Sequence, residues 1–233
     1  SNSLNRIRED HMSHLGNVVK MLIILGGGGH AKSIVAVLQG LPQFNLMGYC
    51  DKADRGSLVG VPFLGTEETI DTLAPNVGLV LGLSYLKSPV DMSLRASLIR
   101  RFEGAFMFPV ISSAQAILAP GVKVGNGSVL LHRCVVNSDA RLGKFCVVNT
   151  NAVIEHDCVI DDNVSISPGA IVCGGCRIGA NTYVGAGAVI RDGVSIVDGV
   201  TIGCGSNVVQ SIQAPGVYFG NPARKVFHGS ENT

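Results

Sequence analysis

Large aliphatic residues recur at every sixth position from Leu118 to Val208. All sixteen positions of this series hold Leu, Val or Ile, and the sixteen positions two residues earlier, from Ala116 to Ser206, hold only small or β-branched residues. An α-helix would give a period near 3.6 residues and a plain strand a period of 2. A short strand followed by a turn, repeated, gives a period of six. The pattern therefore predicts a three-sided solenoid of about five coils, each of about eighteen residues, stabilised by stacking between coils.

The limits of the repeat suggest the second domain. It begins within ten residues after Pro109, and after Val208 it gives way to a tail that includes Gly220 to Lys225 and is expected to cover the end of the solenoid. We assign residues 109–226 to the solenoid domain with its tail. Within it, five glycines directly follow a large position, and we expect turns with positive φ there: Gly125, Gly143, Gly179, Gly185 and Gly203.

Residues 21–108 show a different pattern, in which apolar runs alternate with helical stretches. Strands are expected at 21–25, 46–50, 77–83 and 105–111, and helices at 31–38, 67–73 and 90–101. Such alternation predicts a Rossmann-like βαβαβ domain with a parallel sheet, whose ligands bind at the carboxyl ends of the strands.

Two features of this domain point to ligand binding. Gly26 to Gly29 lie between the first strand and the first helix, where backbone N–H groups and a helix N-terminus can face an anion. Ser33 stands where the G-x-G-x-x-G pattern has its last glycine, so the loop alone is a weak signal. Asp51 ends the second strand, where such folds bind a ribose or base, although a turn residue is the plainer interpretation.

Composition narrows the functional classes. The 233 residues carry a formal charge of +1 and contain no twenty-residue apolar run, which gives no case for nucleic acid binding or a membrane span. Four of seven cysteines fall in the small inward series, which suggests reduced cysteine in a cytoplasmic protein. Cys173 and Cys176 lack a second ligand pair, so no metal site is expected. Residues 1–20 are interpreted as a tag or disordered leader and 227–233 as a flexible end.

One histidine of the repeat stands out as a candidate catalytic residue. His156 lies two positions after a large residue, on an outward-facing place, and its neighbours in adjacent coils are Ser138 and Gly174. An imidazole with open space beside it is a natural general base for activating an amine or hydroxyl. An exposed surface histidine is the alternative, and His132 is interpreted that way. Asp157 could hold the second ring nitrogen of His156, but only at a corner or across chains.

Several of these motifs together resemble one family. The Gly28-Gly29-His30 loop, the six-residue repeat, the His156-Asp157-Cys158 sequence and the tail at 220–225 are similar to NeuD-like sialic acid O-acetyltransferases, which include PglD-type N-acetyltransferases of nucleotide-linked 4-amino-sugars. The resemblance covers nearly all of residues 21–226. It implies a left-handed parallel β-helix, acetyl-CoA as co-substrate, and a homotrimer with sites between subunits.

The resemblance also implies residue roles. His156 would be the general base and Asp157 the acid that raises its basicity. Gly28, Gly29 and His30 would hold the diphosphate of the nucleotide sugar, and Asp51 and Gly82 would lie at its nucleoside. Backbone groups of three further residues would contact acetyl-CoA: Ser165, Ala186 and Cys204.

This chain departs from the family pattern in places. Lys52 stands where a second acid often follows the nucleoside-binding Asp. Leu83 and Ser84 replace the usual residues after the third strand, and the arginine that is usually near this segment comes only at Arg95. We expect N-acetylation of a nucleotide-linked amino-sugar. O-acetylation of a sialic acid and a non-catalytic scaffold are the alternatives, and a dinucleotide-dependent oxidoreductase is a poor fit to the short N-terminal domain.

Overall fold

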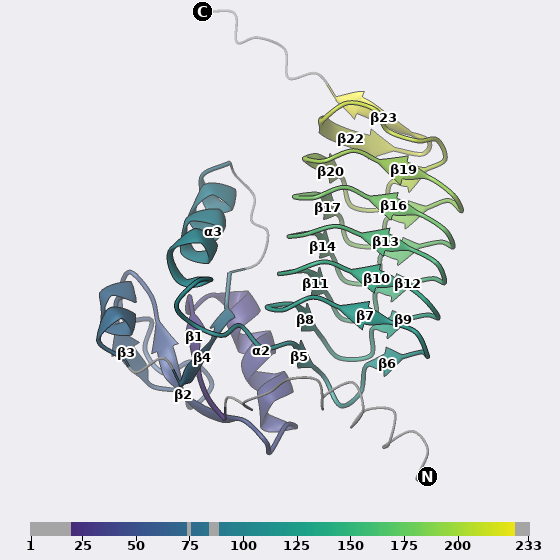
Figure 1. Cartoon of the computed structure of the whole chain (residues 1–233). Coiled ribbons are helices and arrows are strands. Elements are labelled where there is room, and N and C mark those ends of the chain that lie inside the picture. The colour runs from purple at the N-terminus through teal and green to yellow at the C-terminus, as the bar shows by residue number, and fades with distance from the viewer. Residues whose placement is uncertain (1–19, 74–75, 84–88, 227–233) are drawn as a thin grey trace, which may run out of the picture.

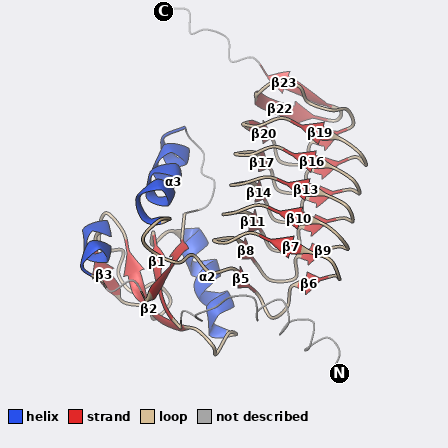
Figure 2. Ribbon diagram, in the orientation of Figure 1, coloured by secondary structure: helices blue, strands red, loops and turns tan. Residues whose placement is uncertain are grey.

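The computed structural model describes residues 20–73, 76–83 and 89–226, and for 89–93 the backbone alone. The expected leader, apart from Lys20, and the expected flexible end lie outside the described residues. The chain forms an α/β part and a tall solenoid that stand side by side (Figures 1 and 2). None of the described helices is long and apolar enough to cross a membrane.

The α/β part is built on a four-stranded parallel sheet in the order β3-β2-β1-β4. Strands β1 and β4 are apolar and buried on both faces, as expected for a sheet covered on both sides. Helices α2 and α3 and the 3₁₀ helix η1 accompany it. The bounds are β1 Met21–Leu25, α2 Gly29–Gln39, β2 Asn45–Cys50, β3 Phe63–Gly65, η1 Glu67–Thr72, β4 Val77–Leu81 and α3 Pro89–Phe102.

One strand of this sheet was placed wrongly by the sequence pattern. The apolar run at 105–111 makes only an isolated bridge, between Met107 and Gly78, and its end starts the solenoid instead. The fourth strand is β3, in which Phe63 pairs with Tyr49 and Gly65 with Cys50. The sequence pattern predicted a turn-rich link there, because so short a strand carries too little periodicity to be recognised.

The solenoid is a left-handed parallel β-helix with three faces, and corresponding strands in adjacent coils are eighteen residues apart, as Val129, Val147 and Ser165 show. The domain face holds β5 Ile111–Ser112, β8 Val129–Leu130, β11 Val147–Val148, β14 Ser165–Ile166, β17 Tyr183–Val184 and β20 Val200–Ile202. The apolar face holds β6 Ile117–Leu118, β9 Val135–Val136, β12 Val153–Ile154, β15 Ile171–Val172, β18 Val189–Ile190 and β21 Asn207–Val208. The polar face holds β7 Lys123–Val124, β10 Arg141–Leu142, β13 Val159–Ile160, β16 Arg177–Ile178 and β19 Ser195–Ile196.

Both six-residue series point into the solenoid. The large aliphatics and the small residues two positions before them form one continuous core, which the sequence pattern predicted. Cys134, Cys146, Cys158 and Cys176 are buried there as free thiols, packed as small apolar side chains.

The turns use a different position from the one expected. The left-handed φ values fall three residues after each large position, at glycines such as Gly121 and Gly175 and also at Asp157 (φ 59°) and Asn163 (φ 57°). Glycines directly after a large position are not in that region, so this expectation was wrong for all five. At those sites the demand is close approach between coils: a Cβ on Gly125 would lie 2.5 Å from the backbone of Gly143.

The solenoid ends in a hairpin of β22 Gly216–Gly220 and β23 Ala223–Val226, which extends the domain face. At the other end, the α/β part packs against the domain face. Val129 and Leu131 join one apolar cluster with α2 and β1, and Phe145 joins another with α3. The α/β part therefore covers the lower coils of this face and the adjoining corner with the polar face.

Candidate functional site

His156 lies at the corner between the apolar and polar faces, between β12 and β13. Its Nδ1 is 2.8 Å from Oδ2 of Asp157. Neighbouring side chains of a strand would point apart, but the left-handed backbone of Asp157 turns the carboxylate back towards the ring. The corner expected from the sequence therefore makes the contact within one chain.

The other ring nitrogen of His156 faces the next coil. A Cβ on Gly174 would lie 2.7 Å from Nε2 and 2.8 Å from Cε1, so the imidazole rests directly over this glycine. The N–H of Gly174 donates to Asp192 Oδ1 at 3.1 Å, which fixes the backbone beneath the ring. The absent side chain leaves the space that Nε2 needs to reach another molecule.

The electrostatics favour a basic imidazole. The hydrogen bond to Asp157 raises the pKa of His156 above its usual 6.5, and the charges of Asp157, Glu155 and Asp192 act in the same direction, while partial desolvation opposes them. When Nδ1–H donates to the carboxylate, Nε2 is left as the acceptor. The side chain is 62% exposed, so a proton can reach it freely.

A second group of candidate residues gathers at the carboxyl ends of β1, β2 and β4. Gly28 is the N-cap of α2 and makes no side-chain cap, and a Cβ on Gly28 or Gly29 would meet nothing within 4 Å. The N-terminus of α2 therefore has open space in front of it, which is the arrangement that an anion site requires. His30 follows in the first turn, and its Nε2 is buried with no hydrogen-bond partner among the described residues.

His30 would contribute a hydrogen bond to a ligand and no charge. Burial, and next the charge of Arg95, lower its pKa to about 3, so the ring is neutral at physiological pH.

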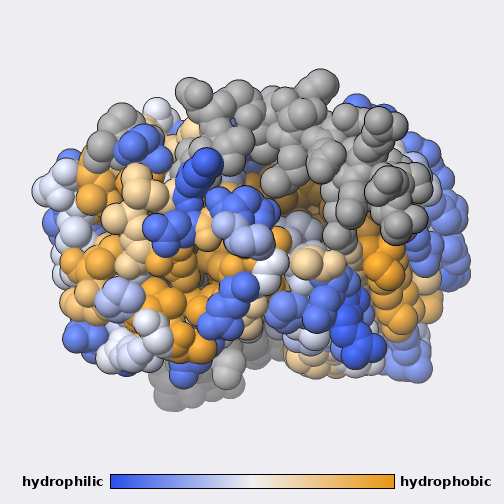
Figure 3. All heavy atoms as spheres, turned by 90° about the horizontal axis from the view of Figure 1, so that it is seen from below, coloured by the Kyte–Doolittle hydropathy of each residue, from blue (hydrophilic) through white to orange (hydrophobic). Residues whose placement is uncertain are grey.

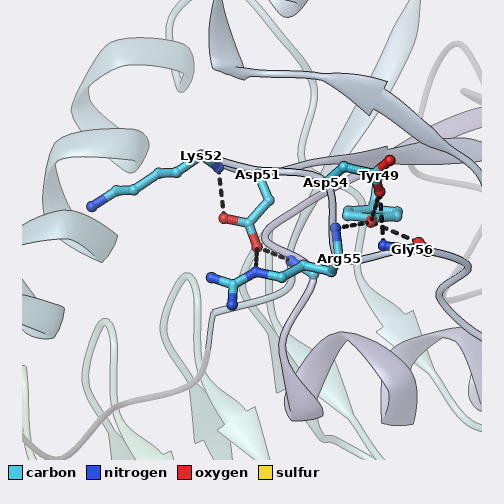
Figure 4. Close-up of polar contacts among 7 residues, drawn as sticks. Tyr49, Asp51, Lys52, Asp54, Arg55 and Gly56 are labelled. Carbon is cyan, nitrogen blue, oxygen red and sulfur yellow. Dashed lines mark hydrogen bonds and ion pairs between the residues drawn. The ribbon is translucent and has the colours of Figure 1, made fainter.

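Asp51 lies where the sequence placed it, but its carboxylate is occupied within the chain. Oδ2 accepts from the N–H of Gly27 at 3.0 Å and from Nε of Arg55 at 3.1 Å, and Oδ1 accepts from the N–H of Lys52 at 2.6 Å (Figure 4). Asp51 thus holds the glycine loop in place. Gly82 allows the loop to pack closely against the end of β4, because a Cβ on Gly82 would lie 2.5 Å from the carbonyl oxygen of Gly26.

A pocket of about 260 Å³ opens beside this loop. Its apolar wall includes Leu83, Leu94 and Leu98, and its polar rim includes Asp51 and Lys52. A small aromatic ring such as a nucleobase suits a concave site of this kind, with apolar walls and few polar groups.

Arg95 is a buried residue whose role the sequence did not reveal. From α3 it donates to Asn163 Oδ1 at 2.7 Å, to the carbonyl oxygen of Phe145 at 2.7 Å and to that of Leu83. Burial lowers its pKa to about 10. It therefore joins the pocket wall to two coils of the solenoid. Although Arg95 comes later in the sequence than the arginine of the family pattern, its hydrogen bond to Leu83 brings it back to the end of the third strand.

The three residues expected at acetyl-CoA do not all lie together. Ala186 and Cys204 occupy the corner between the domain face and the apolar face, in adjacent coils, where the N–H of Gly205 donates to the carbonyl of Ala186. Glycines flank both residues, and the exposed ring of Phe219 lies over Gly203, so small residues and one aromatic ring line the place where an extended chain such as pantetheine could lie. Ser165 lies instead in β14 on the domain face, buried and paired with Val147 and Tyr183.

The solenoid separates the candidate groups within one chain. The α/β part lies on the domain face, and the corner of His156 is the one corner that does not adjoin that face. Ala186 and Cys204 lie at the opposite edge of the apolar face from His156. No cluster of three or more His, Cys, Asp or Glu that could hold a metal occurs among the described residues.

Known proteins show what this architecture is similar to. Residues 21–84 match the family model of the PglD N-terminal domain. The acetyltransferase domain of PglB from Neisseria gonorrhoeae, solved with acetyl coenzyme A, is 30% identical, with a TM-score of 0.83, and the match covers 91% of this chain and all of that one. The chain belongs to the NeuD/PglD-like family of sugar acetyltransferases.

Further members of the NeuD/PglD-like family match with lower identity. PerB from Caulobacter crescentus, solved with CoA and GDP-perosamine, is 25% identical with a TM-score of 0.81, covering 91% of this chain and all of PerB. WeeI from Acinetobacter baumannii is 26% identical with a TM-score of 0.74, covering 89% of this chain and all of WeeI. No curated protein matches the chain significantly.

Proposed function

We propose that the protein is an acetyl-CoA-dependent N-acetyltransferase that acts on the amino group of a nucleotide-linked 4-amino-sugar. The arrangement of His156 carries the proposal: Nδ1 is held by Asp157, and Nε2 lies over Gly174 with no hydrogen-bond partner among the described residues. The relatives support the substrates, since PglB was solved with acetyl coenzyme A and PerB with CoA and a nucleotide-linked amino-sugar.

In this reaction Nε2 of His156 removes a proton from the sugar amine as its nitrogen attacks the carbonyl carbon of the thioester. The carbon–sulfur bond breaks as the amide forms, and the CoA sulfur leaves with a proton returned by the imidazolium. Asp157 stabilises that imidazolium, which is why its carboxylate raises the pKa of the ring. Much of the acceleration comes from holding two reactants in line.

The two domains divide the substrates. We assign the nucleotide sugar to residues 21–108, with Gly28, Gly29 and His30 at the diphosphate and Asp51 and Gly82 supporting the loop beside the nucleoside. Acetyl transfer belongs to residues 109–226, with Ala186 and Cys204 along the pantetheine path. Ser165 was expected with them, and its buried position on the domain face gives that role no support.

A complete site needs more than one chain. The outer row of the apolar face is aliphatic from Ile117 to Val189, and Ile117 and Ile171 in it are 59% and 37% exposed. Hydrophobic side chains are also visible at the surface of the solenoid from below (Figure 3). We propose a homotrimer in which this face contacts a neighbour, because His156 borders it on one side and Ala186 and Cys204 on the other. CoA then lies between the corners of two chains, and the sugar reaches His156 from a neighbour's α/β part.

Two lines support a cytoplasmic location. The buried cysteines are free thiols, which suits a reducing compartment. The proposed substrates are a coenzyme A thioester and an activated sugar.

The test is a thiol-release assay with acetyl-CoA against UDP-, dTDP- and GDP-linked 4-amino-sugars and free sialic acids. We expect turnover with one nucleotide-linked amine and a loss of kcat of roughly 100-fold or more in His156→Ala. Activity on a sialic acid alone would identify an O-acetyltransferase. A non-catalytic scaffold would be favoured if calorimetry showed no acetyl-CoA binding, or if acetyl-CoA bound but no acceptor was turned over.

A further inference from the structure

Arg55 is a charged residue at the glycine loop, and the proposed function assigns it no role. It lies in the segment after β2, and three contacts fix it. Its backbone N–H donates to the hydroxyl of Tyr49 at 2.8 Å, its Cγ lies 3.2 Å from the Cβ position of Gly27, and its Nε donates to Asp51 at 3.1 Å. The start of the side chain thus covers the loop.

The support beneath Arg55 is rigid. The Tyr49 side chain is completely buried, and its hydroxyl also bonds the carbonyl of Gly56 at 2.8 Å and lies 3.2 Å from Asp54 (Figure 4). Burial raises the pKa of Tyr49, so the hydroxyl remains neutral. An arginine held at its backbone, stem and Nε has already lost most of the rotamer freedom that binding would otherwise cost.

The terminal nitrogens of Arg55 remain available. No described residue accepts a hydrogen bond from them, and the side chain is 59% exposed. A guanidinium with Nε on a carboxylate still presents two nitrogens in a planar fork, the geometry that matches phosphate oxygens. Asp51 contacts the guanidinium at Nε, so the N–H groups of the two terminal nitrogens are not used by this carboxylate.

A second, independent feature at the same loop calls for a ligand. The N-terminus of α2 is uncapped, its first turn holds no acidic residue, and Nε2 of His30 is buried without a partner among the described residues. Among the described residues, Asp51 is the one carboxylate that accepts a hydrogen bond from the glycine loop, through the N–H of Gly27.

We propose that Arg55 binds the diphosphate of the nucleotide sugar across the glycine loop, and that Asp51 positions Arg55. This inference rests on the proposed function and adds a binding residue to it. It also changes the role of Asp51, which orients a cation and the loop and does not itself recognise the nucleoside.

The test compares ligands with and without the diphosphate. Calorimetry measures binding of UDP, dTDP and GDP, and of uridine, thymidine and guanosine, to the full-length protein, with inorganic pyrophosphate as competitor. Arg55→Met keeps the length of the stem and removes the charge. We expect it to weaken the best nucleoside diphosphate by ~10- to 100-fold and to abolish competition by pyrophosphate, while nucleoside affinity changes less than about twofold.

Three further proteins control the interpretation. Arg100→Met removes an exposed arginine far along α3 and should leave diphosphate binding unchanged. Asp51→Asn should lose part of the diphosphate affinity, because Nε is no longer held by a carboxylate. If Arg55→Met does not fold, judged by its thermal unfolding, Arg55→Lys replaces it, since a lysine keeps the charge without the fork and should still bind diphosphate several-fold more weakly.

The outcomes separate this inference from the proposed function. Unchanged diphosphate affinity in the Arg55 variants, or an equal loss for nucleoside and diphosphate, would overturn the role of Arg55 and leave N-acetylation standing. A wild-type protein that binds none of the three diphosphates would overturn both.

Discussion

The proposed role of Gly174, which is to leave space for the His156 ring, can be tested with an alanine substitution. The backbone of Gly174 is not in the left-handed region, so alanine fits its conformation. The added Cβ would lie 2.7 Å from Nε2 of His156, whereas ordinary contacts begin at 3.4 Å, so the ring must move by about 0.7 Å. His156 is exposed and can rotate away, so Gly174→Ala should fold normally.

The catalytic cost follows from that displacement. A shift of about 1 Å at a reacting group can cost about 100-fold in rate. We therefore expect Gly174→Ala to lower kcat by roughly 10- to 100-fold, which is about 1.4 to 2.7 kcal/mol of transition-state stabilisation. The Km for acetyl-CoA should change little, because the coenzyme path at Ala186 and Cys204 lies at another corner.

The assay is thiol release from acetyl-CoA under steady-state conditions, together with thermal unfolding. Gly104→Ala is the matched control, since its Cβ would meet nothing within 4 Å and it lies outside the site. Its kcat should equal that of the wild type. If Gly174→Ala is equally active while folded, the imidazole does not act from the position over this glycine, and the assignment of His156 is wrong.

Three other variants test separate parts of the structure. Asp157→Asn removes the main cause of the raised pKa of His156. Because the base must be unprotonated, the acidic limb of the kcat/Km profile should move to lower pH. The plateau should be at least about tenfold lower than in the wild type. An unmoved limb would contradict this role. Arg95→Met leaves three acceptors without a donor and should cost about 3 kcal/mol in urea unfolding, whereas a loss below ~1 kcal/mol would show that the α3 contact is dispensable. Ile171→Glu puts a charge on the apolar face and should yield monomers by light scattering with little thiol release; trimers of full activity would exclude this face as the interface.

The solenoid and the corner that holds His156 could be predicted from the sequence. Because every coil repeats the same geometry, a count of eighteen residues correctly set His156 between Ser138 and Gly174. Local periodicity is enough when contacts are between neighbouring coils.

Other contacts depend on information that periodicity lacks. The bond between His156 and Asp157 requires a left-handed φ at a non-glycine residue, which no apolar pattern marks. Arg95 reaches Asn163, 68 residues away, and Asp51 binds Gly27 across two strands. Such polar contacts depend on how the chain folds in three dimensions and leave no periodic signal, so the partners of Arg95 and Arg55 could not be assigned from residue type alone.

The strict coil length has a consequence for how such a chain can change. An insertion or deletion of eighteen residues above the coil of His156 would lengthen or shorten the stack while every corner keeps its place. A change of six residues between β13 and β15 on the solenoid, even though it preserves each strand and turn, would rotate everything beyond it by one face. Gly174 and Asp192 would then be carried to a different edge from His156. Viable length variants should therefore differ by whole coils in this part of the solenoid, because the stack can then lengthen while His156 stays over Gly174.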